Sequence, residues 1–343
     1  MKLFAPLLLV LAAAAPGEPD PLAPEEVPTA APLAPDIEPT EDEDGRIVFG
    51  EAAPPGSAPW QIEMILPVAA ATETERIADR AAPIEAKRFL DEKQLYERNH
   101  FCGGSYIGGG WIVTAAHCAH HLDTRAMLRD VRIRMGTQNI AGTSGELFAI
   151  ERIVSNAGWS KATGADDIAL IKVRDTGGIR RLGAQLVAIR PQTARDPALI
   201  DQEPLRVTGW GWMGARKAGP VNRATLTGSA QHNPANLQQT SVFNVAATRC
   251  QPQFPKLDLT KFICAAVGAK RADSCQGDSG GPLTRAPRRG EPEFGTPRRV
   301  LAGVVSGGHG CATGAPGIYT RLDRYEEWIG RAKRAGPGFT DLR

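Results

Sequence analysis

Three short segments of this sequence carry residue types that together could hydrolyse an amide bond. These segments are Thr114–Cys118, Asp166–Leu170 and Asp273–Pro282. A serine hydroxyl is a weak nucleophile at neutral pH and needs an imidazole to take its proton, and a buried carboxylate can hold that imidazole in the right tautomer. We therefore predict that Ser279 is the nucleophile, His117 the general base and Asp167 the residue that orients the base.

The glycines around the serine have a role of their own. Gly277 has no side chain, so its backbone N–H can approach a developing negative charge, and with the N–H of Ser279 it would form an oxyanion hole. One such donor stabilises a transition state by about 2.7–4 kcal/mol. Each motif alone is weak evidence, because a single histidine is more often structural and a glycine-rich run is often a turn. Their joint occurrence in one chain is what predicts catalysis.

The segments that must position these residues have the composition of short β-strands. Several β-branched runs are bounded by Gly, Asn or Pro, which favours an antiparallel barrel or a sandwich. These runs are Val131–Met135, Glu146–Val154, Ile168–Val173, Arg206–Thr208 and Val300–Val305.

Two segments depart from this pattern and predict helices. Residues 71–100 are dense in Ala, Glu, Lys and Arg, and Pro83 opens a helical pattern within them. Near the end of the chain, residues 322–335 predict a second helix, with Tyr325, Trp328 and Ile329 on its inward side.

The first 46 residues differ in composition from the rest. Lys2 precedes an apolar run over Leu3–Ala15 that is too short to span a bilayer, which predicts a signal peptide over residues 1–17. Residues 18–46 are acidic and rich in proline, so we predict a disordered prosegment that ends at an exposed Arg46. No other stretch is long enough to cross a membrane, and the predicted location is secreted or periplasmic.

The cysteines and the charge indicate the cellular compartment and limit the classes of partner. The six cysteines occur without a CxxC pair, which favours disulfides formed in an oxidising compartment over free thiols or a structural zinc site. Residues 1–46 carry ten acidic and two basic side chains, so the remainder is more basic than the whole-chain net charge of +2. That charge could favour anionic surfaces, but a solvated surface is the favoured explanation. We predict no nucleic-acid partner.

The sequence resembles the trypsin/chymotrypsin family of serine endopeptidases, with trypsin-like specificity, from Ile47 to about Arg334. The motifs that carry the resemblance are Ile-Val-Phe-Gly, Ala-Pro-Trp-Gln, Phe-Cys-Gly-Gly-Ser, Thr-Ala-Ala-His-Cys, Asp-Ile-Ala-Leu, Gly-Trp-Gly, Gly-Asp-Ser-Gly-Gly-Pro and Pro-Gly-Ile-Tyr-Thr. The resemblance implies an all-β peptidase domain over residues 47–343, with two six-stranded antiparallel barrels, a cleft between them and a C-terminal helix. The order His, Asp, Ser is that of the family, and Asp167 rather than Asp166 directly precedes Ile-Ala-Leu.

The resemblance also implies how substrates bind. Asp273 would lie at the base of the primary pocket and select Arg or Lys, because a buried carboxylate needs a cationic partner. Gly308 and Gly317 would keep the mouth of this pocket open, and Ser306 would pair with the substrate backbone. Gly307 stands where trypsin has a tryptophan, which should widen the non-primed part of the cleft.

Activation is implied by the same resemblance. Cleavage after Arg46 would free the amino group of Ile47, which would insert beside Asp278 and order the pocket and the oxyanion hole. The chain is therefore expected to be an inactive precursor, and since the cut follows an arginine, the enzyme could process itself.

For the cysteines, the resemblance implies the pairs Cys102–Cys118, Cys250–Cys264 and Cys275–Cys311. Leu205 and Arg285 stand where trypsin has a further bridge. Thr137 replaces a glutamate that trypsin uses for calcium, so no metal site and no cofactor are predicted.

Several questions stay open at this point. The 71–100 insertion would lie near the primed side of the cleft, where it could screen large substrates, dock a partner or be a solvated helix without a role. Predicted partners are protein or peptide substrates with Arg or Lys at the cleavage site, with a proteinaceous inhibitor as a further candidate and the oligomeric state undetermined. A non-catalytic homologue and an esterase are the alternative functions, and hydrolysis of Arg-based against Phe-based peptides would discriminate them.

Overall fold

A computed structural model describes residues 50–66, 93–121, 123–213, 216–217, 232–267, 273–311 and 313–335. The predicted signal peptide, the predicted prosegment with Arg46 and Ile47, and residues 67–92 of the predicted insertion lie outside these residues. Among the helices that are described, none has the length and apolar character needed to cross a membrane.

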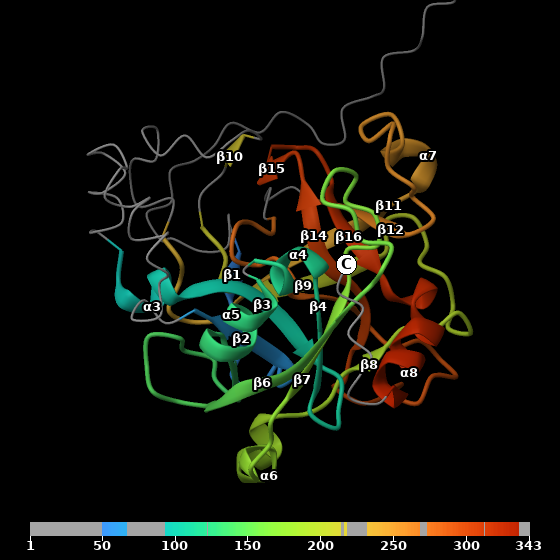
Figure 1. Ribbon diagram of the computed structural model, residues 1–343. Coiled ribbons are helices and arrows are strands. Elements are labelled where there is room, and N and C mark those ends of the chain that lie inside the picture. The colour runs from blue at the N-terminus through green and yellow to red at the C-terminus, as the bar shows by residue number, and fades with distance from the viewer. Residues whose placement is uncertain are drawn as a thin grey trace, which may run out of the picture. The chain divides into compact units, whose positions relative to one another are not determined.

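The first barrel is formed by six antiparallel strands. They are β2 (Gln61–Ile65), β3 (His100–Tyr106), β4 (Trp111–Thr114), β5 (Arg132–Met135), β6 (Glu146–Ser155) and β7 (Ala169–Val173). Their order around the barrel is β2-β3-β4-β7-β6-β5, and β2, β3, β4, β6 and β7 are labelled in Figure 1. The strand β2 pairs with β5 to close the barrel, with Ile62 opposite Met135. Both side chains are fully buried, as are Ile112 and Ile133, so the barrel interior is a continuous apolar core.

The second barrel also has six antiparallel strands. They are β9 (Pro204–Gly209), β11 (Gln238–Val245), β12 (Phe262–Val267), β13 (Pro282–Arg285), β14 (Val300–Gly308) and β16 (Gly317–Arg321). The order is β11-β12-β16-β14-β13-β9, and β9 pairs back onto β11 with Val207 opposite Thr240. The prediction of two six-stranded barrels is confirmed, and the sandwich alternative is wrong.

Short additional strands extend this framework. The strand β1 (Glu51–Ala52) pairs with β11, and β8 (Arg190–Pro191) runs parallel to β14. A separate pair joins β10 (Arg216–Lys217) to β15 (Gly310–Cys311).

Most helices are single turns between strands. They are α3 (Leu95–Asn99), α4 (Ala116–Ala119), α5 (Thr124–Asp130), α6 (Gly178–Leu182) and α7 (Ala247–Cys250), with 3₁₀ turns at Gly183–Gln185 and Leu322–Arg324. The helix α3 is the described part of the predicted insertion. The helix α5 was not predicted, although Asp123 caps it by accepting a hydrogen bond from the backbone N–H of Ala126 at 2.9 Å.

The predicted C-terminal helix is confirmed as α8 (Glu326–Arg334), which follows the 3₁₀ turn instead of beginning at residue 322. Trp328 and Ile329 are buried in the same apolar cluster as the first barrel. Arg152 of β6 also donates a hydrogen bond to the carbonyl of Ala335 at 2.6 Å. The helix α8 is therefore fastened to the first barrel.

The six cysteines form three disulfides, and no free cysteine occurs among the described residues. The pairs are those that the resemblance implies, Cys102–Cys118, Cys250–Cys264 and Cys275–Cys311.

Where trypsin has a further bridge, this chain has a buried ion pair. Leu205 of β9 lies directly opposite Arg285 of β13, and both side chains are inaccessible to solvent. The Arg285 guanidinium donates to Gln192 Oε1 at 2.9 Å and makes a bidentate pair with Glu291. Arg285 is thus a fully buried residue of the second barrel.

Replacing Arg285 with alanine is expected to lower the free energy of unfolding by about 3–5 kcal/mol, because the buried carboxylate of Glu291 would lose its bidentate partner and keep only Arg190 at 3.8 Å and the N–H of Arg288. Urea denaturation measures this change. The matched control is Arg181→Ala, which removes an exposed pair with Glu146 and should change the free energy of unfolding far less, because solvent screens an exposed ion pair. Equal losses for the two variants would contradict the prediction.

Candidate active site

His117 is presented by the short helix that follows β4. Ala115 and Ala116 before it are fully buried, whereas the histidine side chain is 35% exposed. The disulfide Cys102–Cys118 ties this helix to β3. The sulfur atoms lie close to the imidazole, but they are bonded to each other and so are not free to bind a metal there.

The imidazole of His117 is paired with a buried carboxylate. Its Nδ1 lies 2.8 Å from Oδ2 of Asp167, and its backbone N–H donates to Oδ1 at 2.9 Å. Ser306 of β14 adds a hydrogen bond from its hydroxyl to Oδ2 at 2.6 Å. Because Nδ1 carries the hydrogen of this pair, Nε2 of the neutral ring can accept a proton.

The surroundings of Asp167 keep it ionised. The residue is 3% exposed, and burial alone would raise its pKa. The hydrogen bonds and charge of His117, together with the hydroxyl of Ser306, outweigh that effect and lower the pKa of Asp167 below its ordinary value. A carboxylate that stays charged in this position stabilises an imidazolium.

Asp166 is not part of the His117–Asp167 pair and bonds other residues. Its backbone has a φ of 52°, a conformation that non-glycine residues rarely adopt. Its carboxylate accepts from Lys261 Nζ at 2.9 Å on both oxygens and from the Tyr325 hydroxyl at 2.8 Å. These bonds hold the turn that directs Asp167 toward His117.

The loop of Ser279 is tied to both barrels. The Ser279 carbonyl accepts from the N–H of Gly103 in β3 at 2.8 Å, and the N–H of Gly280 donates to Val305 of β14 at 2.9 Å. Gly280 has a φ of 79°, and a Cβ there would lie 2.1 Å from the hydroxyl of Thr114. Only glycine fits between the serine and the first barrel, so the serine backbone is fixed close to the elements that carry the histidine.

Gly277, the predicted oxyanion-hole glycine, is held by a histidine that sequence reasoning missed. His100 donates from Nε2 to the Gly277 carbonyl at 3.0 Å, while its Nδ1 lies 3.2 Å from Glu63 Oε1. Glu63 is itself paired with Arg134 at 2.7 Å. The motif Phe-Cys-Gly-Gly-Ser directly follows His100, and this position next to a motif was the feature of the sequence that could have marked His100.

Asp278 is enclosed by backbone. It is 1% exposed and accepts hydrogen bonds from the N–H groups of Gly211 and Cys275, both at 2.8 Å. A Cβ on Gly209 or Gly211 would lie 2.0 or 2.3 Å from this carboxylate, which explains the Gly-Trp-Gly motif. Burial raises the pKa of Asp278 to about 6, against the opposing effect of the two backbone hydrogen bonds. Its predicted partner Ile47 lies outside the described residues.

Asp273, the predicted specificity residue, is also buried. It is 2% exposed, and its Oδ1 accepts from the N–H of Ser274 at 2.8 Å. A Cβ on Gly317 would lie 3.4 Å from that same oxygen, so the glycine borders the carboxylate directly. The disulfide Cys275–Cys311 fastens the segment that carries Asp273.

A cavity of about 310 Å³ opens beside His117, with Gly307 and Gly308 on its wall. Both glycines are exposed, and a Cβ on Gly307 would have no neighbour within 4 Å. The aromatic rings of Trp159 and Phe254 also line the cavity. This space can receive an apolar side chain next to the histidine.

Comparison with known proteins agrees with the two-barrel fold. The family model described as Trypsin matches residues 73–329. The chain is 30% identical over 293 residues to Trypsin Blo t 3 of Blomia tropicalis, covering 83% of this chain and 85% of that protein. It is 26% identical over 299 residues to human Kallikrein-14, covering 86% and 87%. It is also 30% identical to Serine protease 56 of Mus musculus, but this match covers only 39% of that longer protein. This chain belongs to the trypsin family of serine proteases, and so to the peptide hydrolases.

Proposed function

We propose that this chain is the precursor of an extracytoplasmic endopeptidase that cleaves peptide bonds after Arg or Lys. The observation that carries the specificity is the buried carboxylate of Asp273. It is 2% exposed, and Gly317, which has no side chain, borders it: a Cβ there would lie 3.4 Å from Asp273 Oδ1. A carboxylate in such a place favours a cationic ligand, since a cation replaces the solvation that burial removes.

The proposed chemistry is acyl transfer through a serine ester. Nε2 of His117 takes the proton of the Ser279 hydroxyl while the oxygen attacks the scissile carbonyl, and Asp167 stabilises the imidazolium that forms. The N–H groups of Gly277 and Ser279 bind the oxyanion. The imidazolium then gives its proton to the leaving amine, and a water molecule hydrolyses the acyl-enzyme by the same route.

We further propose that cleavage after Arg46 activates the enzyme, with the α-ammonium of Ile47 pairing with Asp278. The raised pKa of Asp278, about 6, is a cost of burying this carboxylate, and a cation beside it would remove that cost. The carboxylate also holds Gly211 and Cys275, so a change at Asp278 would reach the oxyanion loop.

The extracytoplasmic location rests on the predicted signal peptide and on the three disulfides, which persist in oxidising compartments.

Sequencing the N-terminus of the mature form, with assays on Arg, Lys and Phe peptides, tests these proposals together. We expect a mature chain that begins at Ile47 and hydrolyses the Arg and Lys peptides much faster than the Phe peptide. Equal turnover of the Phe peptide would refute the specificity. A Ser279→Ala precursor incubated alone should remain uncut if the enzyme processes itself, and maturation at the wild-type rate would show that another protease acts.

A further inference from the structure

Asn233 lies against the predicted oxyanion glycine. The residue is 4% exposed, and its side-chain Nδ2 would be 3.1 Å from a Cβ placed on Gly277. The same Nδ2 donates to the carbonyl of Trp210 at 2.6 Å. Asn233 therefore packs on the oxyanion loop and at the same time holds the chain segment beside that loop.

The segment beside the oxyanion loop, residues 210–212, donates two backbone N–H groups to that loop. Trp212 donates its N–H to the carbonyl of Gln276 at 2.8 Å, and Gly211 donates its N–H to Asp278 Oδ1 at 2.8 Å. Because Asn233 fixes Trp210, a shift of Asn233 would be passed to both of these bonds. They flank Gly277 on its two sides in the sequence.

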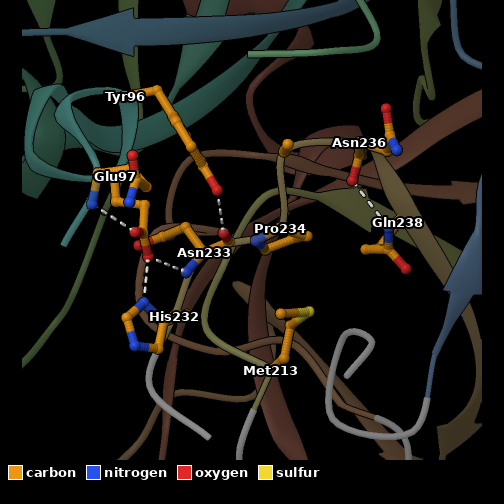
Figure 2. A pocket seen from close by; sticks show the side chains of 10 residues that line it. Tyr96, Glu97, Met213, His232, Asn233, Pro234, Asn236 and Gln238 are labelled. Atoms are coloured by element: carbon orange, nitrogen blue, oxygen red, sulfur yellow. Dashed lines mark hydrogen bonds and ion pairs between the residues drawn. The ribbon is translucent and has the colours of Figure 1, made fainter. Parts of the chain in front are cut away.

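Asn233 is held in turn by three residues that lie at the end of the predicted insertion, and Figure 2 shows two of them, Tyr96 and Glu97. Glu97 Oε1 accepts from the Asn233 backbone N–H at 2.9 Å, and the Tyr96 hydroxyl donates to the Asn233 carbonyl at 3.2 Å. Lys93 Nζ lies 3.4 Å from Asn233 Oδ1. The N–H, the carbonyl and the side chain of one asparagine are thus all bonded by residues 93–97.

Glu97 is the firmest of these contacts. It is 4% exposed, and besides Asn233 it accepts from His232 Nδ1 at 2.9 Å and from the N–H of Gln94 at 2.7 Å. A buried carboxylate with three donors is costly to displace, since removing its donors would leave it uncompensated. It therefore locks α3 to the segment that carries Asn233.

We propose that Asn233 is a positioning residue for the oxyanion loop, and that Lys93, Tyr96 and Glu97 hold it in place. The proposal rests on the proposed function, in which the N–H of Gly277 binds the oxyanion. It also gives a role to the described end of the 71–100 insertion, which forms part of the support of the catalytic loop.

The test compares Asn233→Ala with wild type, both in the processed full-length protein. We expect kcat for an Arg peptide to fall roughly 10-fold, less than the 10²–10³ that follows loss of an oxyanion donor itself. KM should change little. The affinity of a peptidyl-argininal, whose hemiacetal oxygen occupies the oxyanion hole, should fall by the same factor as kcat, whereas benzamidine, which needs only the cation pocket, should bind as before.

The matched control is Asn236→Ala. Asn236 is exposed, lies across the same pocket from Glu97 (Figure 2), and its side chain bonds only Asn139 among the described residues. This variant should keep the wild-type kcat. Asn233→Asp serves as an isosteric second variant, because it keeps the shape but replaces the donor to Trp210 with an acceptor, and it should lower kcat in the same way.

A double-mutant cycle tests the link to α3. The single variant Glu97→Ala should lower kcat. The double variant with Asn233→Ala should have a kcat little lower than that of Asn233→Ala, because both changes release the same contact. Unchanged argininal affinity in both Asn233 variants would overturn the proposal, as would an equal loss of benzamidine affinity. Absence of turnover in the wild-type protein would instead refute the proposed function, so the two failures are distinguishable.

Discussion

Replacing Ser279 with alanine is expected to lower kcat for an Arg-peptide amide by a factor on the order of 10⁴ or more. The variant removes the only hydroxyl that the proposed mechanism acylates, while the binding of the substrate cation by Asp273 stays. KM should therefore change much less than kcat. Because this variant is not expected to process itself, both proteins should be activated by an added protease before the assay.

The two neighbouring aspartates provide the sharpest control for this catalytic unit. Asp167→Asn should lower kcat by a factor on the order of 10⁴, because the amide cannot stabilise the imidazolium or hold the correct tautomer. Asp166→Asn changes a carboxylate that contacts Lys261 and Tyr325 instead, so its loss should be far smaller. Combining Asp167→Asn with Ser279→Ala should cost little more than Ser279→Ala alone, since these residues act as a unit. Equal losses of kcat for the two aspartate variants would contradict the assignment of Asp167 as the residue that orients His117.

Many of the strands and the C-terminal helix could be predicted from local sequence patterns, whereas those patterns left barrel and sandwich open and the two-barrel fold was implied by the family resemblance. The strands follow β-branched runs between turn residues, and the helix at the end of the chain follows an apolar stripe that includes Trp328 and Ile329. His117, Asp167 and Ser279 stand in short motifs, and packing fixes the type of some flanking residues. Gly280 must be glycine, because a Cβ there would lie 2.1 Å from the hydroxyl of Thr114.

The supports of the site could not be predicted in this way, because their partners are distant in the sequence. Lys261 meets Asp166 across 95 residues, and Glu97 meets Asn233 across 136. Nothing near Asn233 in the sequence marks it as a neighbour of Gly277. The resemblance implied that Leu205 and Arg285 face each other. It did not imply the bidentate ion pair of Arg285 with Glu291, which only the structure shows.

Replacing Asp273 with asparagine is expected to lower kcat/KM for Arg and Lys peptides by a factor of about 10²–10⁴. The variant keeps the size of the side chain and removes its charge, so a substrate cation would enter a buried site without a counter-charge. Breaking a buried ion pair in this way costs about 3–5 kcal/mol, and each 1.4 kcal/mol is about a tenfold change.

A neutral substrate separates this electrostatic effect from damage to the site. Turnover of a slow Phe peptide needs no counter-charge from Asp273, so it should not fall in the variant. It should rise if burying a phenyl ring next to an amide is easier than burying it next to a carboxylate that must lose its hydration. A structural fault would lower both activities, since the disulfide Cys275–Cys311 and the loop of Ser279 belong to the same segment. If the Arg and Phe peptides lost activity equally, Asp273 would be a structural acid and the proposed specificity would lose its support. If only the Arg and Lys peptides lost activity, the buried carboxylate would be the feature that selects the substrate.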